Sequence, residues 1–500
     1  MDISERLATP TRRVISKRRG RVAVGGREFG VSSADSQETD SPAYNLNTRF
    51  EMLWVPHNRR KDLKVRRRLL GLAAALAGTL IMVGGGAMNS ALLARAELFA
   101  ASDDFYLPPP LPPTPGAIVR AEPAQVAFSA PGMPGVIPAA ATRMMYVSSD
   151  THDAPTAVVG TYLQPSVPWT GPGERPLIAY AGGTKGQGSQ CASSKLMTQV
   201  VEYQPPTDIV FEYDLVALYT LLSRGMAVVV TDYHGLGTPY VHDYLNRKAQ
   251  AYALLDAARA ALQLPGTGLN PGTPVALYGY SQGGMASAGA AELQSRYAPE
   301  LNVRGAYVGG PVVDDEYFIG YNEGRAAMAQ AFAWLLNGIT ADYPKTRPIL
   351  DAELNDTGKA ILADALGKCA VPASLAQDHP HTSEWTTSGE PLTAVIDRNP
   401  ELKSAFDEQR IGMLTPSVPI LTASAMNDEG VPYVPVREMA AGWCGSGVPV
   451  QLDSNAEIPT ISGLVGTHVM AFFPSLAASQ QWLTDRLAGL PAPNNCGALP

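Results

Sequence analysis

Residues 275–283 read VALYGYSQG, and this stretch decides the fold that we expect. Its first four residues are apolar and predict a buried strand, while the small-residue run 285–293 predicts a helix directly afterwards. A serine flanked by glycines at a sharp turn from strand to helix is a nucleophile elbow. Ser281 is therefore the candidate nucleophile, with its hydroxyl above a helix N-terminus that favours developing negative charge. The alternative is a glycine-rich turn with an incidental serine.

Strands and helices are predicted to alternate on both sides of this elbow. The expected strands are 158–163, 177–181, 227–231, 275–278, 306–308 and 420–423, and the expected helices between them are 215–222, 244–264 and 285–296. Such alternation predicts a mostly parallel sheet covered by helices on both faces. Functional residues should then lie at the carboxyl ends of the strands.

Residues 312–415 interrupt the alternation with predicted helices at 326–336 and 357–367 and few strand signals. An insertion of this kind predicts a mainly helical cap over the active site, although a helical subdomain without function is the alternative. The core is then expected in two parts, at 97–311 and at 416–500.

The N-terminal region predicts that the protein is exported. A basic segment is followed by an apolar run from residue 69, and ARA at 94–96 offers a cleavage site, which predicts a signal peptide over 52–96. An uncleaved membrane anchor over 69–93 is the alternative. Either predicts a secreted or cell-envelope protein. Residues 1–51 fit neither, and we expect a disordered tail or a start assigned too early.

Charge and cysteine usage agree with export. The formal net charge is only −8, and the basic residues crowd the first 70 positions, which does not indicate a nucleic-acid partner. An even number of cysteines in an exported chain predicts two disulfides with three possible pairings, and four free thiols are the alternative. The cysteines are Cys191, Cys369, Cys444 and Cys496.

A catalytic serine needs an imidazole to accept its proton and a carboxylate to orient that imidazole. In this type of fold the chain order is serine, acid, histidine. Of the histidines after Ser281, His379 and His381 lie inside the expected cap and lack the further ligands that a metal site needs. His468 precedes the apolar run 469–473, in a predicted loop, and is the better candidate base.

The acid is expected in the loop after strand 420–423. Asp428 and Glu429 compete there on chemistry alone, and Asp453 is a more distant candidate.

The oxyanion of acyl transfer needs backbone N–H donors. Gln282, which follows the nucleophile, should supply one. The glycine-rich run 182–186 after strand 177–181 should supply the second, from Thr184 or Lys185. This run lacks the Walker pattern of a phosphate loop.

Six sequence blocks together resemble the secretory lipase family of α/β hydrolases, which includes the fungal lipase A type. They occur in family order over roughly residues 100–496. The blocks are DDFY at 103–106, GT at 183–184 with QCA at 190–192, TDYHGLGTP at 231–239, GYSQG at 279–283, DEGVPY at 428–433 and GTH at 466–468.

The resemblance implies Asp428 rather than Glu429 as the acid of the triad, together with Ser281 and His468. It also implies a helical cap and the disulfides Cys191–Cys369 and Cys444–Cys496. Two departures affect the oxyanion loop. Members often have His-Gly-Thr where this chain has AGGT at 181–184, and Lys185 replaces an acidic residue of the fungal lipase.

The expected function is that of an exported serine hydrolase acting on acylglycerols or similar lipid esters at a lipid interface. It needs no metal or organic cofactor and no nucleic acid, and no obligate protein partner is evident. An acyltransferase that passes the acyl group to a cell-envelope alcohol is the enzymatic alternative. A non-catalytic binding protein is the alternative from another class, and the complete set of serine, aspartate and histidine argues against it.

Overall fold

The computed structural model describes residues 103–126, 139–204, 208–370, 379–455, 457–461 and 465–500. The signal peptide or anchor expected within 52–96 and the tail expected at 1–51 lie outside these ranges. Among the helices of the described residues, none combines the length and the apolar character needed to cross a membrane.

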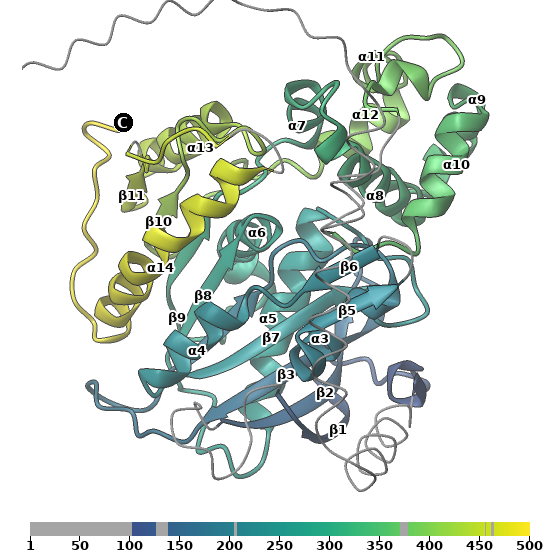
Figure 1. The fold of residues 1–500 in the computed structure, drawn as a ribbon. Coiled ribbons are helices and arrows are strands. Elements are labelled where there is room, and N and C mark those ends of the chain that lie inside the picture. Colours follow the sequence, from purple (N-terminus) through teal and green to yellow (C-terminus); the bar gives the residue numbers. More distant parts are fainter. Residues whose placement is uncertain (1–102, 127–138, 205–207, 371–378, 456, 462–464) are drawn as a thin grey trace, which may run out of the picture. The chain divides into compact units, whose positions relative to one another are not determined.

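A nine-stranded sheet forms the core, with the strand order β1-β2-β3-β7-β4-β8-β9-β10-β11 (Figure 1). The strands from β7 to β11 in this order pair in parallel, whereas β1, β2 and β3 add an antiparallel edge that ends on β7. The expected mostly parallel sheet is confirmed. The strands are β1 Ile118–Ala124, β2 Ala139–Ser149, β3 Pro155–Pro165, β4 Leu177–Ala181, β7 Ala227–His234, β8 Val275–Tyr280, β9 Val303–Gly309, β10 Ile420–Ala423 and β11 Val450–Asp453, and a separate hairpin pairs β5 Val201–Gln204 with β6 Asp208–Phe211.

Helices connect the parallel strands, and those from α7 to α12 follow one another between β9 and β10. The helices are α3 Ser193–Gln199, α4 Leu215–Ser223, α5 Arg247–Gln263, α6 Gln282–Tyr297, α7 Asp315–Tyr321, α8 Ala326–Asp342, α9 Arg347–Glu353, α10 Asp356–Ala365, α11 Leu392–Arg398, α12 Pro400–Asp407, α13 Tyr433–Gly445 and α14 Gly466–Leu487.

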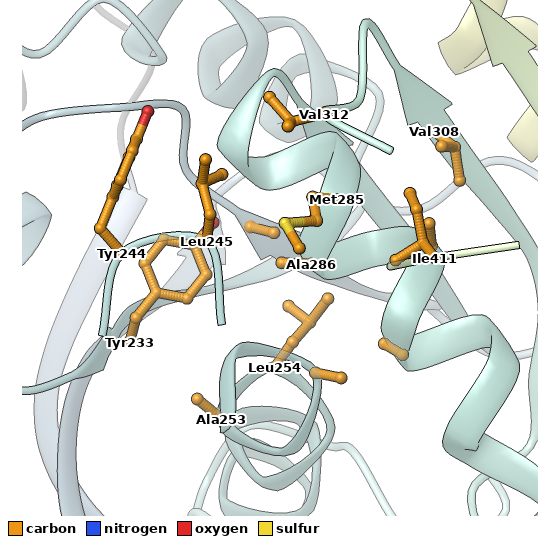
Figure 2. Close-up of a cluster of buried hydrophobic side chains, with 14 of the residues drawn as sticks. Tyr233, Tyr244, Leu245, Ala253, Leu254, Met285, Ala286, Val308, Val312 and Ile411 are labelled. Carbon is orange, nitrogen blue, oxygen red and sulfur yellow. The ribbon is translucent and has the colours of Figure 1, made fainter. Parts of the chain in front are cut away.

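The central strands are buried on both faces, which explains their continuous apolar sequences. Along β8, Val275 and Leu277 join a cluster with α5 and α6, whereas Ala276 and Tyr278 join a second cluster with α4 and α14. Figure 2 shows Leu254 of α5 with Met285 and Ala286 of α6 inside the first cluster. Because α5 and α6 are rich in alanine, they pack closely against each other, and α6 also packs against β8.

Both disulfides that the resemblance implies are present, Cys191–Cys369 and Cys444–Cys496. The first joins the segment after β4 to the segment after α10. Backbone hydrogen bonds accompany it, because the Ala370 N–H donates to the Lys185 carbonyl over 2.7 Å and the Gln187 N–H donates to the Lys368 carbonyl over 2.9 Å. The glycine-rich loop after β4 is thus held to residues 368–370 on both sides of the disulfide.

We predict that the paired change Cys191→Ser and Cys369→Ser lowers both stability and ester hydrolysis. This disulfide spans 178 residues, so its removal should reduce the free energy of unfolding by about 5 kcal/mol in the chain-entropy description. Loosening of the glycine-rich loop should also lower kcat at temperatures where the variant is folded. Chemical denaturation and ester assays measure the two effects.

The matched control is Cys444→Ser with Cys496→Ser, which opens a disulfide of 52-residue separation. This pair should lose about 4 kcal/mol and keep its activity while folded. Equal losses of activity in both double variants would contradict a special role for the first disulfide.

Candidate active site

Ser281 lies between β8 and α6 with φ 61° and ψ −120°, a region that is rare for residues with a side chain. Close backbone contacts leave no room for larger neighbours. A Cβ at Gly279 would lie 1.9 Å from the Gly283 carbonyl oxygen, and one at Gly283 would lie 2.1 Å from the Ala181 carbonyl oxygen. The glycines of the elbow are therefore required by space, and the serine is held at the carboxyl end of β8.

His468 and Asp428 form a buried pair. His468 Nδ1 lies 2.7 Å from Asp428 Oδ2, while Asp428 Oδ1 accepts the backbone N–H groups of Gly430 and Val431, each over 2.8 Å. The carboxylate is thus fully engaged and orients the imidazole through Nδ1. His468 Nε2 is buried and has no hydrogen-bond partner among the described residues. It is the nitrogen left to accept a proton.

The His468 ring packs beside the elbow. Its centroid lies 5.0 Å from that of Tyr280, the residue before Ser281, and the Tyr280 hydroxyl donates to the His468 carbonyl over 2.6 Å. Ser281 and His468 line the same cavity. The expectation of a loop at His468 is wrong, because the residue lies in the first turn of α14, which begins at Gly466 and includes the apolar run 469–473.

Glu429 accepts hydrogen bonds from the start of helix α14 and makes none with the His468 imidazole. Its two carboxylate oxygens lie 3.0 and 3.2 Å from the backbone nitrogen of Thr467, where they accept an N–H group at the start of α14. Asp453 ends β11 and accepts the backbone N–H of Asn455 over 3.0 Å. Of the three acids considered, only Asp428 contacts His468 within the described residues.

The pKa of His468 is raised above its ordinary value of 6.5. Burial alone would lower the pKa, but the charge of Asp428, the hydrogen bond to it and the charge of Glu429 outweigh that effect. The imidazole therefore holds a proton more firmly than a free histidine does.

Gln282 is the first residue of α6, so its backbone N–H has no acceptor within the helix. Its side chain is anchored, because Nε2 lies 3.0 Å from His242 Nε2. His242 Nδ1 lies 2.8 Å from the His234 carbonyl, to which it must donate, so Nε2 accepts from Gln282. Burial lowers the pKa of His242, which keeps this ring neutral. Sequence reasoning missed His242, because only histidines after Ser281 were considered.

The glycine-rich loop presents Thr184 to the cavity. The Thr184 hydroxyl oxygen lies 3.0 Å from the Tyr244 hydroxyl oxygen, and the Tyr213 hydroxyl donates to the Thr184 carbonyl over 2.8 Å. The Lys185 side chain is buried away from the cavity lining, with its amine 2.7 Å from Asp214 and 2.9 Å from Glu212. Of the two candidates for the second donor, Thr184 lines the cavity and Lys185 does not.

The cavity has a volume of about 370 Å³ and is walled mainly by apolar side chains. Helices α7 and α8 contribute Phe318, Met328 and Trp334, and α14 contributes Val469 and Phe473, both about half exposed. His379 and His381 lie elsewhere, near Glu384 and Glu323 respectively, and both side chains are exposed.

The inserted helical segment also makes hydrogen bonds to the loop that contains Asp428. The Tyr321 hydroxyl donates to the Asp428 carbonyl over 2.7 Å, and the Asn322 side chain donates to the Gly430 carbonyl over 2.9 Å. Arg325 donates to the Glu429 carbonyl. The position of Asp428 therefore depends on residues far from it in sequence.

The strand order and the serine elbow define an α/β hydrolase. The model of the secretory lipase family matches residues 203–495, and the chain belongs to this family. A Mycobacterium tuberculosis protein named probable inactive lipase is 28% identical over 406 residues, which are 79% of this chain and 84% of the relative. Lipase A of Arthroderma benhamiae is 28% identical over 412 residues, which are 80% of this chain and 82% of the relative.

The fold also matches solved structures. Candida antarctica lipase A superimposes with a TM-score of 0.63 and 20% identity, covering 77% of this chain and 85% of the lipase. The rice cell wall degrading esterase LipA of Xanthomonas oryzae gives a TM-score of 0.60 and 18% identity, covering 75% of this chain and 100% of the esterase. At these identities the likeness shows the shared fold.

We predict that Glu429→Gln moves the acid limb of kcat/KM for ester hydrolysis to lower pH. We expect the neutral form of His468 to act as the base, so its raised pKa places this limb above pH 6.5. Removal of the Glu429 charge should lower that pKa, while the glutamine oxygen still accepts the Thr467 N–H. The plateau rate at higher pH should stay within about tenfold of the parent, because the change alters the local field and not the triad.

Glu438→Gln, an exposed change on α13, is the matched control and should leave the profile unchanged. A crippled Glu429→Gln protein beside a nearly normal Asp428→Asn protein would show that the acid has been assigned one residue out of place.

Proposed function

We propose that this protein is a serine hydrolase of carboxylic esters that acts on acylglycerols or similar lipid esters. The observation that carries this proposal is the His468–Asp428 pair, whose second imidazole nitrogen is free within the cavity that Ser281 lines. The apolar wall suits a fatty acyl chain. Relatives named secreted triacylglycerol lipases occur in Malassezia furfur, and one is 28% identical over 249 residues.

The proposed reaction begins when Ser281 Oγ attacks the ester carbonyl and His468 Nε2 takes the hydroxyl proton. Asp428 stabilises the resulting imidazolium, and the Gln282 and Thr184 N–H groups bind the oxyanion. The proton then passes to the leaving alcohol as the C–O bond breaks, leaving an acyl-enzyme. Water attacks that acyl-enzyme, gives its proton to His468, and releases the acid as the proton returns to Ser281.

We further propose that residues 312–415 act as a cap and that the protein is exported. The contribution of α7 and α8 to the cavity wall supports the first point, and the names of the secreted relatives support the second. Ser281, Asp428 and His468 are proposed as the catalytic residues. The mycobacterial relative is named probable inactive lipase, so catalysis by this chain is the point to test first.

We predict that Ser281→Ala lowers the rate of p-nitrophenyl ester hydrolysis by about a thousandfold or more, because the acyl-enzyme cannot form. His468→Ala should have an effect of similar size. Ser295→Ala, an exposed change on helix α6, which follows Ser281, is the matched control and should keep the full rate. Assays with esters of short, medium and long acyl chains measure the preferred acyl-chain length. A triacylglycerol emulsion then tests hydrolysis of acylglycerols.

A folded parent protein that hydrolyses none of these esters would overturn the proposal and favour a binding function. A parent that transfers the acyl group to an added alcohol in preference to water would instead identify an acyltransferase.

A further inference from the structure

We propose that His234, Asp243 and Asp342 form a binding site for a divalent transition-metal ion of the Zn²⁺ type. The site would join helix α8 of the inserted segment to the loop between β7 and α5. Ester hydrolysis by Ser281 and His468 needs no such ion, so this inference stands apart from the proposed function.

The three side chains come together from distant parts of the chain. His234 ends β7, Asp243 lies shortly before α5, and Asp342 ends α8. One potential ligand atom from each residue lies within 4.8 Å of the other two, and His234 Nδ1 is 3.2 Å from Asp243 Oδ2. The residues are 9%, 0% and 8% exposed, respectively. The group is therefore a buried cluster and not a surface collection of acids.

The charges of this cluster are poorly balanced without a cation. Asp243 Oδ1 is buried and has no hydrogen-bond partner in the described part of the chain, and it lies 3.5 Å from His242 Nδ1. Among the described residues, no lysine or arginine forms an ion pair with either carboxylate. Two buried carboxylates thus share one histidine, and a divalent cation would compensate the excess negative charge.

The donor set indicates the class of metal. One imidazole nitrogen and two carboxylate oxygens suit Zn²⁺, whereas Ca²⁺ requires six to eight oxygen ligands. Tetrahedral zinc places neighbouring ligand atoms about 3.3 Å apart, close to the spacing of His234 and Asp243. The ligand atoms of the cluster lie within 4.8 Å of one another, so side-chain movement would have to draw them toward the ion, and water would complete the coordination.

Neighbouring groups already orient one of the ligands. Asp342 Oδ2 accepts a hydrogen bond from the Asn246 side chain over 2.7 Å and from the Thr151 hydroxyl over 2.9 Å. Hydrogen bonds of this kind fix the ligands of metal sites. These hydrogen bonds hold the Asp342 carboxylate in place at the end of α8.

The position of the site gives the ion a structural role near the active site. Asp243 directly follows His242, whose Nε2 anchors the Gln282 side chain. Asp342 belongs to α8, which contributes Trp334 to the cavity wall. A bound ion would therefore fasten the inserted segment to the loop behind the proposed oxyanion donor.

The test uses purified full-length protein that has been stripped with EDTA and titrated with ZnCl₂. We expect one zinc ion per chain by calorimetry and elemental analysis, and a Tm that rises by a few degrees at zinc well above Kd. Co²⁺ in place of zinc should give the visible bands of a low-coordinate site. Asp243→Asn and Asp342→Asn should each abolish the stoichiometric zinc, the Tm rise and the cobalt bands.

In EDTA these two variants should melt at or above the Tm of the parent, because each removes a buried negative charge. The matched control is His379→Gln with His381→Gln, which removes exposed imidazoles and should keep the zinc site. Absence of stoichiometric zinc in the parent protein would overturn the proposal, whatever the variants do. Variants that retain the full Tm rise would show an adventitious ion only, bound elsewhere.

Discussion

The backbone of Ser281 is held at φ 61° and ψ −120° by the close approach of α6 to β8 and β4, and the arrangement of the site depends on this contact. The strained backbone conformation is maintained because β4 and β8 are packed on both faces, which leaves the turn at Ser281 no room to adopt another conformation. The elbow glycines follow from the same crowding. In consequence the serine, the start of α6 and the Gln282 N–H are positioned together.

The remaining parts of the site reach the elbow from separate segments of the chain. Asp428 follows β10, His468 begins α14, and Thr184 follows β4. Each of these residues is held in position by contacts from another segment of the chain. Glu429 accepts an N–H at the start of α14, residues from α7 onward hold the loop of Asp428, and the Cys191–Cys369 disulfide holds the loop of Thr184. The helical insertion therefore supports the site as well as walling its cavity.

Much of the fold could be predicted because the central strands are apolar throughout and strands alternate with helices. The antiparallel edge of the sheet was harder to predict from the sequence, since β1 and β2 mix polar and apolar residues without strict alternation. His468 was expected in a loop just before the apolar run 469–473, but α14 begins at Gly466 and includes that run. Glu429, distant in sequence, supplies an acceptor for the N-terminus of this helix. The anchoring of Gln282 by His242 depends on a tertiary contact that no local pattern encodes.

We infer that the strained Ser281 is a working nucleophile. Incubation of the folded full-length protein with a fluorophosphonate, followed by peptide mass spectrometry, tests this role without any choice of ester substrate. We expect one covalent adduct per chain, on the peptide that contains Ser281, and much slower labelling of the His468→Ala protein. A folded protein that gains no adduct, or gains one on a different residue, would show that Ser281 is not the nucleophile.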